Sequence, residues 1–185
     1  MSVAVSQERR AISRGQSTML TACLDLEGRT TVAIMRDFSD HGAGFECDKD
    51  VAVGQTIRYR WGDQKARTGE VIWQRDGRFG VVNTHAIDST DYRNRIPRSV
   101  RVPLTAPADI YTAYGRIEAE VLNIAHRGLC FLASKPISKG TLATIKLGRR
   151  RLEFVTAKWS EGERFGVSFP KPITVYEMAA MLEGA

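Results

Sequence analysis

An internal repeat constrains the fold of this chain more than any other feature. Ten positions between residues 37 and 81 recur when 86 is added to their numbers, with no gap in register, and eight of the ten pairs are identical. The pairs are Asp37/Asn123, Ser39/Ala125, Gly42/Gly128, Phe45/Phe131, Gly54/Gly140, Gly62/Gly148, Trp73/Trp159, Phe79/Phe165, Gly80/Gly166 and Val81/Val167. Such a repeat indicates two small domains of one fold.

The repeat divides the 185 residues into two domains of about 90 residues, which we place at 1–92 and 93–185. No apolar run approaches the roughly 20 residues that a membrane-spanning helix needs, so we expect a cytoplasmic protein without membrane insertion. The three cysteines have no CxxC spacing and an odd count, which argues against a disulfide framework or a zinc site. We therefore expect them to be small core or subsurface residues.

Turn signals alternate with short segments rich in β-forming residues in both copies. Asp76-Gly77 between two apolar segments is a strong hairpin signal, and Glu161-Gly162 repeats it. Many short antiparallel strands in about 85 residues favour a closed barrel, because closure removes exposed strand edges. The fold class is therefore all-β, with two small antiparallel barrels in tandem.

One helix is expected at the C-terminus. Thr174 and Glu177 have the spacing of a capping box, and the residues after them place an apolar stripe on one helix face. The stripe consists of Val175, Met178, Ala179 and Leu182. We expect this helix to pack against the second barrel.

The two pairs that differ between the copies are both polar, at positions 37/123 and 39/125. The framework therefore repeats while the polar chemistry does not, which points to a ligand site in the first domain. A net charge of +6 and a pI near 9.5 favour anionic partners in general. Arginines cluster ahead of each domain, at positions 9, 10 and 14 and at positions 93, 95, 98 and 101.

Two short motifs flank the start of the first domain. Arg10 and Arg14 form RxxxR ahead of it, and Asp37, Ser39 and Gly42 form DxSxxG after its second expected strand. Either motif alone is ordinary surface or turn chemistry. In this order, and followed by a hairpin with Trp73 and Phe79-Gly80-Val81, they resemble the PilZ family, and the repeat makes the chain similar to a tandem PilZ protein.

The resemblance implies a six-stranded barrel in each domain and a receptor for the bacterial second messenger cyclic di-GMP. It assigns ligand binding to Arg9, Arg10, Arg14, Asp37, Ser39 and Gly42. Arginine can fork onto phosphate oxygens and can stack on or bond to guanine. A carboxylate at 37 can accept hydrogen bonds from guanine N–H groups, a hydroxyl at 39 is a further polar group, and glycine at 42 permits close approach.

The second copy departs from each polar element of the motif. It has Asn123 and Ala125, and its arginines at 95, 98 and 101 are spaced three apart. We expect it to serve as structural support, as contact surface for a protein partner, or in self-association, which allows a homodimer. The receptor would then convert ligand binding by domain 1 into a conformational change that a partner reads, in control of motility or exopolysaccharide output.

Other interpretations are less favoured. Trp73 and Trp159 are interpreted as core residues and left out of the site, and the three histidines show no metal spacing. No nucleophile, base and orienting group can be assembled, so we expect a protein that is not an enzyme and has no cofactor.

A basic barrel binding nucleic acid nonspecifically is an alternative function, disfavoured because aromatic residues are only 8% of the chain. A PilZ-like adaptor without ligand binding is another.

Overall fold

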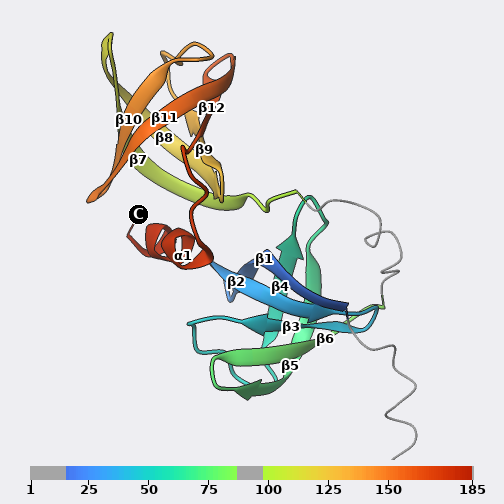
Figure 1. The fold of residues 1–185 in the computed structure, drawn as a ribbon. Coiled ribbons are helices and arrows are strands. Elements are labelled where there is room, and N and C mark those ends of the chain that lie inside the picture. Colours follow the sequence, from blue (N-terminus) through green and yellow to red (C-terminus); the bar gives the residue numbers. More distant parts are fainter. Residues whose placement is uncertain (1–15, 87–97, 185) are drawn as a thin grey trace, which may run out of the picture. The chain divides into compact units, whose positions relative to one another are not determined.

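The computed structural model describes residues 16–86 and 98–184, which divide into two compact units, each built around one barrel (Figure 1). The first barrel closes in the strand order β1-β2-β3-β6-β5-β4. Its strands are β1 (Gln16–Leu26), β2 (Arg29–Phe38), β3 (Gly42–Glu46), β4 (Thr56–Trp61), β5 (Arg67–Arg75) and β6 (Arg78–Asn83). The expected boundary between residues 92 and 93 lies outside the described residues.

The second barrel has the same strand order, read as β7-β8-β9-β12-β11-β10 around its closed sheet. Its strands are β7 (Val102–Thr112), β8 (Gly115–Ala125), β9 (Gly128–Leu132), β10 (Leu142–Leu147), β11 (Arg150–Glu161) and β12 (Arg164–Ser168). The registers agree as well, since Gly44 pairs with Gly80 in the first barrel and Cys130 with Gly166 in the second. The prediction of two six-stranded antiparallel barrels is confirmed.

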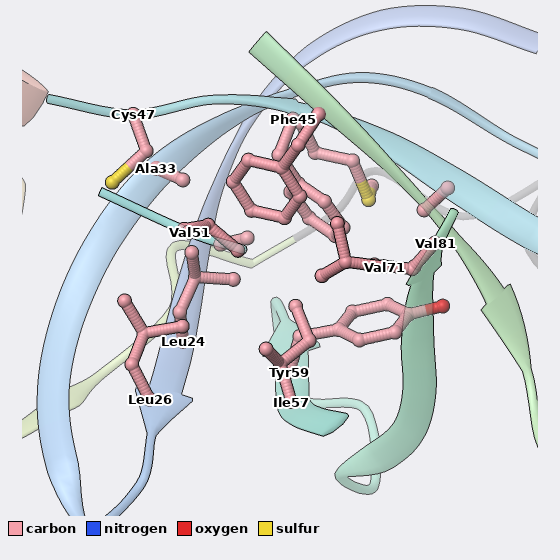
Figure 2. Packing of buried hydrophobic residues seen from close by; sticks show 14 of the residues in the cluster. Leu24, Leu26, Ala33, Phe45, Cys47, Val51, Ile57, Tyr59, Val71 and Val81 are labelled. Carbon is pink, nitrogen blue, oxygen red and sulfur yellow. The ribbon is translucent and has the colours of Figure 1, made fainter. Parts of the chain in front are cut away.

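Each barrel has a core of its own, built from inward-facing residues that alternate with outward-facing ones. Phe45 and Phe79 stack with ring centroids 5.3 Å apart, and their repeat partners Phe131 and Phe165 stack at the same separation. Figure 2 shows Phe45 and Tyr59 among aliphatic side chains of the first core. Burial of such rings supplies much of the stability of a domain this small.

The C-terminal helix α1 (Val175–Glu183) begins at the predicted capping box, in which the Thr174 hydroxyl accepts from the Glu177 amide. Its buried residues are Met178, Ala179 and Met181, whereas Val175 and Leu182 are half-buried, so the buried face is rotated from the predicted stripe. Its C-terminal end lies beside the β10–β11 turn of the second barrel, where Gly184 approaches Gly148. Among residues 16–86 and 98–184, no helix has the length and apolar character to cross a membrane.

The prediction that Trp73 and Trp159 are core residues is wrong. They are 44% and 39% exposed, and each indole lies over the glycine that faces it on the neighbouring strand, Gly80 or Gly166. Strict alternation would place Trp73 on the same inner face as Val71, but a bulge between these residues reverses the alternation. The same bulge precedes Trp159 in the second barrel.

This arrangement predicts that Gly166→Ala destabilises the second barrel by about 1–3 kcal/mol, because the new Cβ would overlap the Trp159 indole. Urea denaturation measures the change. In a Trp159→Ala background the same substitution should cost much less. An equal cost in both backgrounds would mean that the indole does not cover this glycine.

Candidate functional site

The DxSxxG residues lie where β2 ends and β3 begins, on the outer face of the first barrel. Asp37 is exposed, and its carboxylate leans over Gly44 of β3, so that a Cβ at residue 44 would stand 2.6 Å from Asp37 Oδ2. Among the residues that the structure describes, no hydrogen-bond or ion-pair partner of this carboxylate is found. The Asp37 carboxylate is therefore a solvent-accessible acceptor held at a defined place by the glycine beneath it.

Ser39 and Gly42 shape the turn between these strands. The Ser39 amide donates to the Gly42 carbonyl at 2.8 Å, and the His41 amide donates to Ser39 Oγ at 3.3 Å. A side chain at Gly42 would overlap the Val81 carbonyl of β6. Glycine is therefore required at position 42 by the neighbouring strand, and the equivalent Gly128 lies against Val167 in the second barrel in the same way.

A buried polar network supports this turn from inside the first barrel. The Tyr59 hydroxyl donates to Asn83 Oδ1 at 2.5 Å, and the Asn83 backbone amide donates to the His41 carbonyl at 2.7 Å. Asn83 Nδ2 adds a long contact of 3.4 Å to the Asp40 carbonyl. Burial raises the pKa of Tyr59 to about 12, so its hydroxyl keeps the donated proton at neutral pH.

The second barrel keeps the backbone part of this network and replaces the side chains. The Phe169 amide donates to the Arg127 carbonyl at 2.9 Å, as Asn83 does to His41, but Phe169 and Ile145 stand at the positions of Asn83 and Tyr59. Sequence reasoning did not identify Asn83 or Tyr59. The signal that could have found them is again a polar residue in the first copy opposite an apolar one in the second.

Four residues form a continuous row across the outer face of the first barrel. Asp37 pairs with Gly44, Gly44 with Gly80, and Gly80 with Trp73, on strands β2, β3, β6 and β5. The carboxylate covers one glycine and the indole covers the other. We call this row the glycine floor, because its two paired glycines are buried beneath the Asp37 carboxylate and the Trp73 indole.

The matching row of the second barrel is Asn123, Cys130, Gly166 and Trp159. The half-buried Cys130 side chain stands where the first barrel has Gly44. Burial raises the pKa of the Cys130 thiol, so it stays protonated at neutral pH. The equivalent surface thus lacks the carboxylate and carries a side chain where the first barrel has Gly44.

A charged cluster lies beside the glycine floor on the same outer face. Glu46, two residues after Gly44, accepts from Arg36 Nε at 2.9 Å and from Arg78 Nε at 3.1 Å. The hydrogen bond from Arg36 is the main reason that the pKa of Glu46 lies below its usual value. Arg36 is thereby directed to Glu46 although it precedes Asp37 in the chain.

The structure places Asp37, Ser39 and Gly42 at one turn, together with the exposed His41. The remaining predicted ligand residues, Arg9, Arg10 and Arg14, lie outside the described residues. Within 16–86 and 98–184, no three His, Cys, Asp or Glu residues are grouped so that they could hold a metal ion. The site offers a carboxylate acceptor and an exposed aromatic side chain over adjacent strands, which suits binding of a planar polar group.

Comparison with known proteins identifies the family. Residues 8–98 match the model of the PilZ domain, so the chain belongs to the PilZ family through its first barrel. No curated protein sequence matches the chain.

The chain also resembles several solved structures, with low sequence identity and TM-scores of 0.40 or less. They include the Bacillus subtilis inhibitor of motility MotI/DgrA (TM-score 0.40, 11% identity, 91% of this chain and 95% of that one covered). Another is the Borreliella burgdorferi PlzA protein in complex with c-di-GMP (TM-score 0.36, 10% identity, 92% of this chain and 91% of that one covered). A third is Escherichia coli YcgR in complex with c-di-GMP (TM-score 0.35, 12% identity, 89% of this chain and 83% of that one covered). Likenesses at this level do not assign residue roles.

The buried network predicts that Asn83→Ala loosens the DxSxxG turn. The substitution leaves the Tyr59 hydroxyl buried without its acceptor, which should cost about 1–3 kcal/mol of unfolding free energy. Amide hydrogen exchange at Ser39 and His41 should become faster than in the wild type, and this increase should be larger than the increase at Phe45 in the core.

Adding Tyr59→Phe to Asn83→Ala should recover part of the lost stability, because the stranded hydroxyl is then gone. Unchanged exchange at Ser39 and His41 in the single variant would show that the turn holds itself without Asn83.

Proposed function

We propose that this protein is a cyclic di-GMP receptor that binds its ligand on the first barrel. The observation that carries the proposal is the glycine floor, in which an exposed carboxylate and an exposed indole lie over two paired glycines in the barrel that matches the PilZ family. The second barrel has the same framework without this chemistry, so the floor is not a by-product of the fold.

The ligand carries two guanines and two phosphates, and the proposed site offers a partner for each group. Asp37 Oδ1 and Oδ2 can accept from the N1–H and N2–H groups of a guanine, whereas the same edge of adenine presents an acceptor at N1. The exposed face of Trp73 offers a stacking surface, an interaction of about 1–3 kcal/mol per base. Together these groups would select a guanine.

Phosphate binding in this proposal falls to the arginines that precede the barrel. Arg10 and Arg14, assisted by Arg9, carry the fork geometry that suits phosphate oxygens, and their guanidinium planes can also stack on a guanine. In this proposal they would reach the bound ligand from the segment ahead of β1. Ligand bound between this segment and the glycine floor would tie the two together.

A biological role follows, as a further step of the proposal, from the way that bound ligand would tie the N-terminal segment to the first barrel. A change at the start of the first barrel would alter the surface that a protein partner reads, with motility or exopolysaccharide output as the regulated process. The proposed role is one of binding, in keeping with the match to the PilZ domain. A cytoplasmic location fits a receptor for an intracellular messenger.

Isothermal titration of the full chain with cyclic di-GMP should give a dissociation constant in the micromolar range or tighter. Charge-assisted hydrogen bonds contribute about 1.5–3 kcal/mol each, so Arg10→Ala and Arg14→Ala should each weaken binding by roughly tenfold to a hundredfold. Arg98→Ala is the matched control ahead of the second barrel and should change the affinity little. Absence of heat and of any thermal shift at saturating ligand would remove the receptor proposal.

Gly44→Cys places the second barrel's residue on the glycine floor and should weaken cyclic di-GMP binding at least tenfold. The new Cβ would stand 2.6 Å from Asp37 Oδ2, so the carboxylate would have to move from its place over residue 44. Cys130→Gly is the reciprocal control and should leave the affinity unchanged. If Gly44→Cys bound as well as the wild type under reducing conditions, the floor would not be the binding surface.

A further inference from the structure

A bulge in β2 places Arg36 beside Asp37 on the outer face of the first barrel. The register of β2 against β3 shifts between Met35 and Asp37. At such a bulge two residues oppose one, here Arg36 and Asp37 opposite Gly44. Met35 and Phe38, on either side, are buried, which turns the two residues between them outward. The Asp37 carboxylate is therefore within reach of the Arg36 side chain.

Arg36 nevertheless bonds a different carboxylate. Its Nε and Nη2 donate to Glu46 Oε2 at 2.9 and 2.5 Å, and Arg78 Nε donates to the same oxygen at 3.1 Å. The Arg36 and Glu46 side chains are 30% and 24% exposed, so their ion pair is partly shielded from water. Asp37 and Glu46 are the two acidic residues of strands β2, β3 and β6. Asp37 is therefore the alternative partner of Arg36 on these three strands.

An arginine paired with Asp37 would interfere with the proposed recognition of guanine. The two carboxylate oxygens are proposed to accept from N–H groups of the base, and a guanidinium donates to the same two oxygens in a fork. Glu46 lies two residues beyond Gly44 on β3, about 7 Å along the strand. A guanidinium bonded to Glu46 is thus drawn away from the carboxylate that covers Gly44.

The second barrel has the same bulge without these charged groups. Leu122, Asn123 and Leu132 stand at the positions of residues 36, 37 and 46. Arg164, by contrast, keeps the position of Arg78. The barrel therefore tolerates this last arginine without a glutamate opposite it. The other arginine and the glutamate occur in the copy that has the aspartate, which links them to the chemistry of that residue and not to the framework.

We propose that Glu46 is a positioning residue of the ligand site, which keeps Asp37 available for guanine by holding Arg36 away from it. The proposal rests on the cyclic di-GMP site proposed above and adds to it a residue outside the DxSxxG motif. Glu46 acts through Arg36 without touching the ligand. Its loss releases the guanidinium, which then competes with the base for the Asp37 carboxylate.

Isothermal titration with cyclic di-GMP tests the competition. Glu46→Leu should weaken binding about two- to sixfold, because an exposed ion pair is populated only a few-fold over its open state and the affinity falls with the open share of Asp37. Arg36→Leu alone should leave the affinity unchanged. The double variant of Arg36→Leu and Glu46→Leu, which has the residues of the second barrel, should recover the wild-type affinity because no guanidinium is left to compete.

Arg78 provides the matched control, because Glu46→Leu releases it as well. It lies on β6, two strands from the strand that carries Asp37, so it should not compete for that carboxylate. Adding Arg78→Leu to Glu46→Leu should therefore leave binding as weak as in Glu46→Leu. Should leucine at position 46 disturb the barrel, Glu46→Gln keeps the shape of the side chain. It should weaken binding in the same direction and be rescued by Arg36→Leu.

A measurement without ligand separates this proposal from the receptor proposal. The Arg36 Nε–H signal in ¹H–¹⁵N spectra, assigned with Arg36→Leu, reports which carboxylate the guanidinium contacts. Asp37→Asn should leave this signal unmoved in the wild-type background and should shift it in the Glu46→Leu background. If the chain bound no cyclic di-GMP, the receptor proposal would fall, and this spectral comparison alone would decide whether Glu46 directs Arg36 away from Asp37.

Four results would overturn the proposal. The first is that Glu46→Leu and Glu46→Gln both bind cyclic di-GMP as tightly as the wild type. The second is weak binding by Glu46→Leu that Arg36→Leu does not restore, or that Arg78→Leu restores equally well, which would give Glu46 a merely structural role. The third is weaker binding by Arg36→Leu alone, which would make Arg36 a contact of the ligand. The fourth is an Arg36 Nε–H signal that already responds to Asp37→Asn in the wild-type background.

Discussion

The pairing of β3 with β6 is the constraint on which the rest of the first barrel depends. It joins strands that are far apart in sequence, and it places Gly42 against the Val81 carbonyl and Gly44 opposite Gly80. Glycines are needed there because the neighbouring backbone, carboxylate and indole occupy the space of a Cβ. The contact that closes the barrel therefore also makes the glycine floor.

The two barrels keep this closing contact and differ in what surrounds it. Gly128 lies against Val167 and Gly166 lies under Trp159, so the framework of the second barrel is intact. Its floor, however, carries Cys130, and its outer surface acquires an exposed Phe154 at a bulge. Duplication of a stable framework leaves the outward residues free to diverge, because substitutions on an outer barrel face cost little stability.

Much of the fold was predictable from the sequence. The 86-residue repeat, the Asp76-Gly77 and Glu161-Gly162 turns and the capping box at Thr174 predicted two antiparallel barrels and a helix, and the family resemblance supplied the six strands of each barrel, as observed. These signals are local or are reinforced by repetition. The prediction failed for the tryptophans, because the bulge after Val71 reverses the alternation of strand residues and has no clear local sequence signature.

The site was predictable only where its residues are close together in the sequence. Asp37, Ser39 and Gly42 are close in sequence and form one motif, but Gly44 and Trp73 join them through strand register. Asn83 joins through a buried contact with Tyr59. Register and buried side-chain contacts depend on the whole closed sheet, so a motif search finds one edge of the site and misses its floor.

The central claim is that ligand binds the floor of the first barrel and not the equivalent surface of the second. The chain has three tryptophans, of which Trp61 is buried while Trp73 and Trp159 occupy matching outer positions. Their indole N–H signals can be followed in ¹H–¹⁵N spectra during titration with cyclic di-GMP, after assignment with Trp73→Phe and Trp159→Phe. The account predicts a large saturable shift of the Trp73 signal with the Trp159 signal unmoved. A shift of Trp159 alone, or equal shifts of both signals, would contradict it.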